Sequence, residues 1–319
     1  MAVKITIIGM DALGQSLALA LKNSKAELNI VGHDRKRERM RKAKQAKVAH
    51  HVDWNLINAI DGASLIFINE AIHEIRQTLE HIGSELQIDA VITDTCSYKA
   101  QIIEWAADFL PKNVYFVAST PLVKTETLNP TLFEQQRYAL IPQPDTPPAA
   151  VRLLSNAIKL IGAEPLFMDV AEHDSFMAAV VQLPIVTSTA LLNLTTKAQA
   201  WREMAVMANK LFSNATTLPS SDPKTLTSLL RYSRQPLLEW LKGLHEELDT
   251  LQTLITQEDE GTELEAHLTE LMEAQHRWHR ERKQTSYEQN LGQQMDEIKE
   301  TSHFMSFLFG SGRKQRKKR

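Results

Sequence analysis

A strand, a glycine turn and a helix follow one another within the first 22 residues, and this order constrains the fold more than any other feature. Residues 3–8 are mostly β-branched, Gly9 breaks the run, and residues 12–22 are rich in leucine and alanine. Glycines and polar residues interrupt the stretch too often for a signal peptide or a membrane span. The sequence therefore predicts a βα unit here.

Strand-like and helix-like segments keep alternating up to about residue 169. Helices are predicted at residues 36–47 and 149–161. Further strands are predicted at residues 27–31, 64–68, 90–93, 114–117, 138–141 and 164–168. Such alternation is typical of a parallel sheet that is covered by helices on both faces. We therefore expect an α/β fold with a Rossmann-type, doubly wound, mainly parallel sheet, in a dinucleotide-binding domain of residues 1–169.

No convincing strand pattern follows residue 169. The pattern becomes helical, and breaks are predicted near Pro184, Pro219, Pro223 and Gly261. We expect an all-α helical domain for substrate binding and dimerisation at residues 170–305. A basic, disordered tail is expected at residues 306–319.

Composition narrows the classes of partner. The 36 Lys and Arg residues nearly balance the 39 Asp and Glu residues, so no strong field would attract nucleic acid. The apolar stretches at residues 185–194 and 237–254 exceed what a monomer needs to bury, which predicts a homodimer. A single cysteine, Cys96, suits the reducing cytoplasm. No membrane partner is expected and no metal site, because His276 and His279 lack a third ligand.

The first turn has the features of a phosphate-binding loop. Gly9 and Gly14 match two glycines of a G-x-G-x-x-G fingerprint between a strand and a helix, whose free N–H groups suit a pyrophosphate. Asp34 ends the next strand about twenty residues later, as a carboxylate that accepts the ribose hydroxyls of an adenosine does. Asp34 favours NAD, whereas Arg35, with Arg37 and Arg39, suits the 2′-phosphate of NADP. Both cofactors stay open.

Asp11 occupies the place of the second glycine of the fingerprint. A carboxylate about 4 Å from a pyrophosphate oxygen costs several kcal/mol at an effective dielectric constant near 20. The alternative is structural, since an aspartate at this position caps the first turn of the helix and takes the N–H groups that a phosphate would use. Asp11 therefore predicts weak cofactor binding or none.

Six short sequence motifs occur in this order along the chain: IIGMDALGQSLALAL, GHDR, TDTCSYK, FVASTP, AEHDSFMAAVVQLP and SSDP. Over residues 3 to about 255 the chain resembles the prephenate and arogenate dehydrogenases, which carry similar motifs in this order. The resemblance implies NAD(P)-dependent oxidative decarboxylation of prephenate or arogenate, in tyrosine biosynthesis. It also implies a dimer formed through the helical domain.

The resemblance assigns roles to single residues. Ser97 would contact the substrate hydroxyl, and Lys99 would help to bind the substrate. The matched positions are Gly9, Leu13, Gly14 and Asp34 in the cofactor motif, and Thr93, Asp94, Ser97 and Lys99 in the T-D-x-x-S-x-K segment.

Three further segments depart from the family pattern, and the last of them departs at two positions. Thr120 stands where the family has a catalytic histidine, and a threonine hydroxyl cannot act as a base near neutral pH. Thr217 stands where the family has an arginine that grips the substrate carboxylate. Residues 181–185 have lost a serine and a histidine of the family motif. With Asp11, these changes predict impaired or altered chemistry.

Three side chains of types that often act in catalysis are expected to have structural roles here. Asp174 is interpreted as a carboxylate at the start of its own helix, and His173 as a packing or capping partner. Cys96 has no matched histidine and is interpreted as a spectator thiol.

The sequence leaves two alternative functions open. The first is a dehydrogenase that acts on prephenate, arogenate or a related cyclohexadienol. The second is a catalytically degenerate relative that serves as a binding or regulatory subunit, which Asp11, Thr120 and Thr217 favour. A nucleic-acid-binding role for the basic tail lacks a supporting basic face elsewhere in the sequence.

Overall fold

The computed structural model describes residues 2–283, except 124, 220–221 and 259. The chain forms two compact units, Met1–Leu237 and Leu238–Arg319. The tail expected at residues 306–319 and the end of the helical domain expected at residues 170–305 lie outside the described residues.

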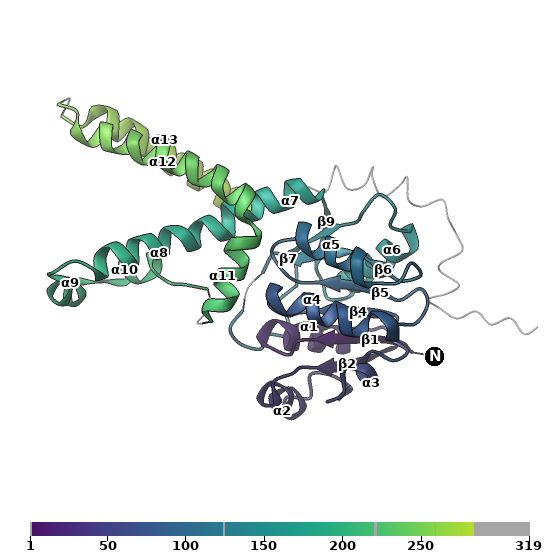
Figure 1. Cartoon of the computed structure of the whole chain (residues 1–319). Helices are drawn as coiled ribbons and strands as arrows, with labels where there is room; N and C mark the ends of the chain where they lie inside the picture. Colours follow the sequence, from purple (N-terminus) through teal and green to yellow (C-terminus); the bar gives the residue numbers. More distant parts are fainter. Residues whose placement is uncertain (1, 124, 220–221, 259, 284–319) are drawn as a thin grey trace, which may run out of the picture. The chain divides into compact units, whose positions relative to one another are not determined.

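A six-stranded parallel sheet forms the centre of the first unit (Figure 1). Its strand order is β3-β2-β1-β4-β5-β6. From β1 the chain first adds strands on one side and then, with β4, on the other, while all the strands stay parallel. This order confirms the predicted doubly wound sheet, and sheets of this kind bind ligands beyond the carboxyl ends of the strands at such a switch point. The strands are β1 (Val3–Ile8), β2 (Leu28–His33), β3 (His51–Val52), β4 (Leu65–Ile68), β5 (Val91–Asp94) and β6 (Tyr115–Phe116). At two residues, β3 is too short to give a sequence pattern.

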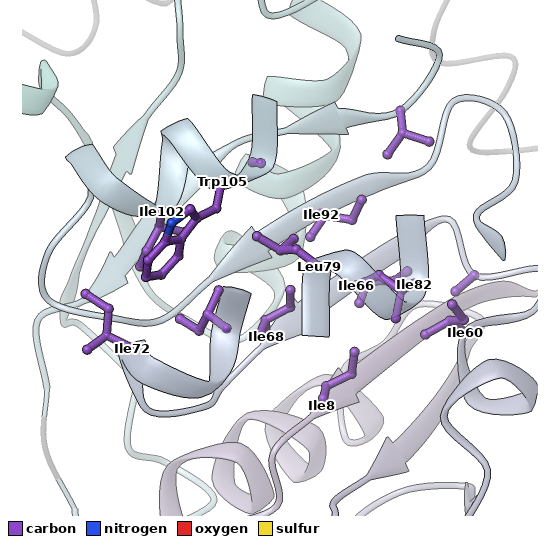
Figure 2. Close-up of a cluster of buried hydrophobic side chains, with 14 of the residues drawn as sticks. Ile8, Ile60, Ile66, Ile68, Ile72, Leu79, Ile82, Ile92, Ile102 and Trp105 are labelled. Atoms are coloured by element: carbon purple, nitrogen blue, oxygen red, sulfur yellow. The ribbon is translucent and has the colours of Figure 1, made fainter. Parts of the chain in front are cut away.

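Helices cover the sheet because each presents an apolar face to it. On one face, Ile75 and Leu79 of α4 pack with Ile102 and Trp105 of α5 in a single buried cluster (Figure 2). Right-handed crossovers place α1 on the other face, where it contacts α6. The helices are α1 (Ala12–Lys22), α2 (Arg37–Gln45), α3 (Leu56–Ile60), α4 (Ile72–Ile82), α5 (Ala100–Phe109) and α6 (Pro148–Leu160), with a short 3₁₀ turn at Gly83–Glu85.

A second sheet of three strands follows the first. It contains β7 (Ala118–Pro121), β8 (Arg137–Ile141) and β9 (Glu164–Phe167), with β7 and β8 antiparallel. The expectation that residues 138–141 and 164–168 extend the main sheet is therefore wrong. An apolar alternating pattern identifies a strand but does not identify the neighbour to which it bonds.

A continuous helical stretch, Val170–Thr196, begins the helical part of the chain. It consists of α7 (Val170–Met177), a π-helical turn (Ala178–Gln182) and α8 (Leu183–Thr196). The break expected at Pro184 is wrong, because the wider π turn changes the hydrogen-bond pattern just where the proline has no N–H to donate. Among the described residues this is one helix long and apolar enough to cross a membrane, a test that helices of soluble proteins also pass.

Shorter helices complete the first unit, and two long ones form the described part of the second. In the first unit these are α9 (Trp201–Met207), α10 (Lys210–Ala215) and α11 (Pro223–Tyr232). The second unit contains most of α12 (Arg234–Thr256) and all of α13 (Thr262–Lys283), which starts directly after Gly261 at a φ of 83°.

An aromatic pair fixes α11 to the sheet domain. The rings of Trp105 on α5 and Tyr232 on α11 meet edge to face, with centroids 5.2 Å apart and planes at 90°. Leu229 packs against the same buried cluster. This contact joins residues that are more than a hundred positions apart.

We predict that Tyr232→Ala lowers the free energy of unfolding by about 2 kcal/mol, because it removes a half-buried ring and its edge-to-face partner contact. Urea unfolding followed by circular dichroism measures the change. The matched control is Trp54→Ala, whose ring is 55% exposed and whose loss should change stability by less than about 0.5 kcal/mol. Equal effects of the two substitutions would contradict the proposed docking of α11.

Candidate active site

The candidate site lies at the carboxyl edge of the main sheet. The last residues of three neighbouring strands are in register, since Ile8 pairs with Ile68 and Ile68 pairs with Asp94. The residues that follow them, Gly9, Asn69 and Thr95, therefore emerge side by side. This is where open parallel sheets bind their ligands.

Two glycines shape the first turn by the close approach of backbones. Gly9 has a φ of 99°, and a Cβ added to it would lie 1.9 Å from the Asn69 carbonyl oxygen. A Cβ on Gly14 would lie 1.9 Å from the Gly9 carbonyl oxygen. Neither position tolerates a side chain, so both glycines serve the tight strand-to-helix turn that the fingerprint requires.

The Asp11 carboxylate caps helix α1. Its Oδ1 accepts hydrogen bonds from the Gly14 N–H at 3.1 Å and from Asn69 Nδ2 at 2.7 Å. The Asn69 amide also donates to the Gly9 carbonyl oxygen at 3.0 Å and accepts from the Thr95 hydroxyl at 2.7 Å. The structural role proposed for Asp11 is thus present, and a side-chain carboxylate holds one N–H group of the helix start.

Asp34 follows β2 at the place where the sequence analysis expects the adenosine to bind. Asp34 is buried, and its oxygens accept the backbone N–H groups of Met10 and Lys36, both at 2.7 Å. The carboxylate therefore faces the glycine turn, as a ribose-binding carboxylate must. Arg39 approaches Asp34 at 3.4 Å.

Arg35 points towards helix α4. Its guanidinium donates to the Gln77 side chain at 2.8 Å and to the Thr78 hydroxyl at 2.6 Å, and it lies 3.4 Å from Glu70. Burial raises the pKa of Glu70, and the Thr78 hydroxyl and Arg35 oppose that rise. The guanidinium is thus held by protein partners, which leaves its predicted contact with a cofactor phosphate as a proposal only.

A buried ion pair supports the turn after β5. Lys99 is fully buried, and its ammonium donates to Asp94 Oδ2 at 2.5 Å and to the Ser119 carbonyl oxygen at 2.6 Å. Burial raises the pKa of Asp94, and Lys99 opposes that rise. Thr93 is also buried and hydrogen-bonds through its hydroxyl to that of Ser119 at 2.7 Å. The Lys99 ammonium is directed into the fold, so its predicted substrate contact stays a prediction.

A second buried carboxylate joins the helical segment to this turn. Asp174 on α7 accepts the backbone N–H groups of Lys99 at 2.8 Å and of Ala100 at 2.9 Å, and so caps helix α5. The interpretation that Asp174 serves the start of its own helix is wrong, because Asp169 caps α7. The sequence pattern could not show this, since the capped helix lies about 75 residues earlier.

Thr120 lies in a chain of buried polar groups. Its hydroxyl is 2.8 Å from the Cys96 carbonyl oxygen and 2.9 Å from Nε2 of His173. Nδ1 of the same histidine is 2.8 Å from Asp174 Oδ1. Thr120, His173 and Asp174 are each less than 5% exposed. Thr120, which the sequence analysis aligns with the family's histidine, is therefore in contact with His173.

The π-helical turn adds a residue that the sequence analysis did not single out. Gln182 is fully buried, and its Nε2 lies 3.5 Å from the Ser97 carbonyl oxygen. Its Oε1 is buried with no hydrogen-bond partner in the described part of the chain. A π turn in a helix frequently marks a functional site. Asn69 was also missed, although a polar residue directly after an apolar strand was a usable signal.

Other predicted site residues lie around this cluster or away from it. Ser97 is half-buried beside Cys96, and Leu13 is half-buried in the first turn of α1. Burial raises the pKa of Cys96 to about 11, which fits a spectator thiol. Thr217 is exposed and donates to the Ser213 carbonyl oxygen at 2.6 Å. Over the described residues, no group of three or more metal-binding side chains is present.

Comparison with known proteins decides the family. The profile of the prephenate dehydrogenase nucleotide-binding domain matches residues 17–166, and that of the prephenate dehydrogenase dimerization domain matches residues 169–274. The chain belongs to the prephenate dehydrogenase family. The match of the first profile begins after the Gly9–Gly14 turn, and the match of the second begins at Asp169, after a gap of two residues.

Relatives of this family member are distant but cover most of it. It is 25% identical to a prephenate dehydrogenase of Bacillus subtilis over 80% of this chain and 71% of that protein. It is 27% identical to one of Lactococcus lactis over 80% of this chain and 72% of that protein.

Solved structures share the fold. A prephenate dehydrogenase from A. aeolicus, in complex with hydroxyphenyl propionate and NAD+, aligns with a TM-score of 0.79 at 21% identity, over 87% of this chain and 98% of that one. Synechocystis arogenate dehydrogenase aligns with a TM-score of 0.71 at 24% identity, over 86% of this chain and 100% of that one.

We predict that Lys99→Met lowers the free energy of unfolding by about 3–5 kcal/mol, because it leaves the buried Asp94 carboxylate without its cation. Thermal or urea unfolding measures the loss. The matched control is Lys42→Met, which breaks an exposed pair with Glu38 and should cost less than about 1 kcal/mol. A cost below that level for Lys99→Met would show that the pair is not isolated from water.

Proposed function

We propose that this family member is an NAD(P)-linked oxidoreductase that oxidises prephenate, arogenate or a related cyclohexadienol with loss of carbon dioxide. The observation that carries the proposal is the convergence at one sheet edge of the Gly9–Gly14 turn, Ser97 and the buried chain behind Thr120. The nucleotide-binding profile and the NAD+ complex of the A. aeolicus relative support it.

The residues fit a dinucleotide at two places and oppose it at a third. Gly9 and Gly14 allow the tight turn that leads into the N-terminus of α1, and Asp34 accepts the Met10 N–H of that turn, next to where a ribose would bind. When bound, the nicotinamide would accept a hydride from the substrate. Asp11 would place a negative charge beside the pyrophosphate, so we propose that it reduces the affinity for the cofactor. Because Arg35 is held by Glu70, Gln77 and Thr78, the site favours NAD over NADP.

The substrate side is proposed from the β5–α5 turn. Ser97 would hydrogen-bond the substrate hydroxyl, next to Thr120 at the family's histidine position. Lys99 would act through the turn, since its ammonium is buried. Thr217 would not grip a carboxylate, because a threonine has no charge and this one is exposed.

A catalytically degenerate binding or regulatory subunit is the second candidate. Two observations favour it: the Asp11 carboxylate occupies the N–H of Gly14, and Thr217 replaces a cation. We place either form in the cytoplasm, where the single thiol of Cys96 stays reduced.

We predict that Asp11→Asn raises the affinity for NADH at least tenfold, because it removes the charge and keeps an oxygen that caps α1. Titration of purified protein with NADH and NADPH, followed by fluorescence, measures the dissociation constants. Asp53→Asn, which removes a carboxylate outside the glycine turn, is the control and should leave them unchanged.

The same preparations test the function. Reduction of NAD(P) that depends on added prephenate or arogenate supports the dehydrogenase. Cofactor binding without turnover would support the degenerate subunit, and an absence of binding by both the native chain and Asp11→Asn would overturn the dehydrogenase proposal.

We propose that the protein is a homodimer formed through its dimerization domain. Large apolar side chains on α8 to α10 are uncovered, including Leu194 at 73%, Val206 at 87% and Leu211 at 78% exposure. Exposed apolar area of this kind is characteristic of protein interfaces. The alternative, a membrane-bound helix, rests on the length and composition of Val170–Thr196 alone.

We predict that light scattering after size exclusion gives twice the chain mass of 36.1 kDa in the absence of detergent. Leu194→Glu should shift the population towards the monomer, because it buries a charge in the interface. Leu160→Glu, on an exposed position of α6, is the control. A monomeric native protein would contradict the proposal.

A further inference from the structure

We infer that His173 is the proton acceptor of the site and that it acts through the hydroxyl of Thr120. This inference rests on the proposed dehydrogenase function and deepens it. It assigns the work of the missing family histidine to a relay of three residues, Thr120, His173 and Asp174, that the fold brings together from β7 and α7.

Hydrogen-bond accounting fixes one end of the relay. Asp174 accepts one backbone N–H group with each of its two oxygens, so both oxygens serve as acceptors. Nδ1 of His173, 2.8 Å from Asp174 Oδ1, must therefore carry a proton and donate it. A ring that is anchored in this way has Nε2 as its working nitrogen.

The other end of the relay has two states. The Thr120 hydroxyl carries one proton and contacts two acceptors, the Cys96 carbonyl oxygen and Nε2 of His173. With a neutral ring, the hydroxyl donates to Nε2. With a protonated ring, Nε2 donates to the hydroxyl oxygen and the hydroxyl turns to the Cys96 carbonyl. When the ring takes up a proton, the hydroxyl can thus move its own hydrogen bond from Nε2 to the Cys96 carbonyl oxygen.

The charges around the ring permit this uptake. Asp174 on the same helix and Asp94 on β5 are the carboxylates near it. Burial raises the pKa of Asp94, and His173 is among the groups that oppose that rise. Lys99 on α5 is the nearby cation, and its ammonium is neutralised by Asp94. Tyr98 faces Asp174, and burial raises its pKa, so it stays neutral. Two carboxylates and one cation that is already paired with Asp94 therefore surround the ring.

The relay balances the proposed reaction. The bound nicotinamide would accept a hydride from the hydroxyl-bearing ring carbon. The substrate hydroxyl would then give its proton to the Thr120 oxygen, and Thr120 would pass its own proton to Nε2. Carbon dioxide then leaves, and the electrons of the broken carbon–carbon bond enter the ring. The phenolate that forms takes the proton back by the reverse route. In this proposal His173 is a positioning and relay residue, and Thr120, which is 2% exposed, is the group that would meet the substrate hydroxyl beside Ser97.

The first test needs no turnover. Nitrogen-15 NMR of the histidine rings, assigned with His173→Gln, reports the protonation of each nitrogen of His173 across pH. We expect Nδ1 to stay protonated and Nε2 to titrate. Thr120→Val should shift the Nε2 signal and its titration, and Thr120→Ser should restore both. A His173 signal that is the same in the native protein and in Thr120→Val would overturn the relay.

The second test is kinetic. Thr120→Val should lower kcat about 100-fold or more with little change in KM, and Thr120→Ser should stay within a few-fold of the native protein. In the native protein kcat/KM should fall as the pH drops, because a ring that is already protonated at Nε2 cannot accept the substrate's proton. His173→Gln should lose this acidic limb of the profile. Retention of the limb in folded His173→Gln would overturn the proposal.

Controls separate the relay from the proposed function and from unfolding. Thr250→Val and His245→Gln, both at exposed positions of α12, should change neither kinetics nor the His173 signal. Melting temperature and the dissociation constant for NADH are measured for every variant. A native protein that binds NADH without turnover refutes the proposed dehydrogenase, whereas the NMR comparison still decides whether Thr120 and His173 are coupled.

Discussion

The hydrogen bonds of Asp174 are the interaction on which the rest of the site depends. This one carboxylate caps α5, and so fixes the turn that carries Cys96, Ser97 and Lys99, and it also orients His173. Because it is buried, an unpaired oxygen would cost more than an exposed one, which makes the arrangement strongly specified. The helical segment is therefore tied to the sheet at the point where chemistry is proposed.

Asn69 holds the glycine turn in place by hydrogen bonds, as Asp174 holds the turn between β5 and α5. Its amide links Gly9, Asp11 and Thr95, which follow or flank three neighbouring strands. Asp11 is thus part of a network as well as a helix cap. A phosphate that displaced the carboxylate would have to satisfy the Asn69 amide too, so cofactor affinity at this turn depends on two residues and not on one.

The architecture could be predicted from the sequence because its signals are local. Apolar runs, Gly9, Gly14 and the position of Asp34 identify a doubly wound sheet and its phosphate turn, and the cap formed by Asp11 follows from its place before α1. The second sheet, the cap that Asp174 gives to α5 and the contact of Thr120 with His173 all join distant segments. Local pattern carries no information on such pairings. Gln182 was missed for the same reason, since its π turn depends on the packing of the whole helix.

The departures from the family pattern act on different steps. Asp11 would repel the pyrophosphate equally before and during hydride transfer, because the diphosphate takes no part in the chemistry. Such uniform repulsion raises KM and leaves kcat unchanged. Thr120 and His173 handle a proton that moves during the reaction, so they bear on kcat. The proposed weak cofactor site and the proposed proton path are therefore physically compatible in one protein, because the first would affect KM and the second kcat.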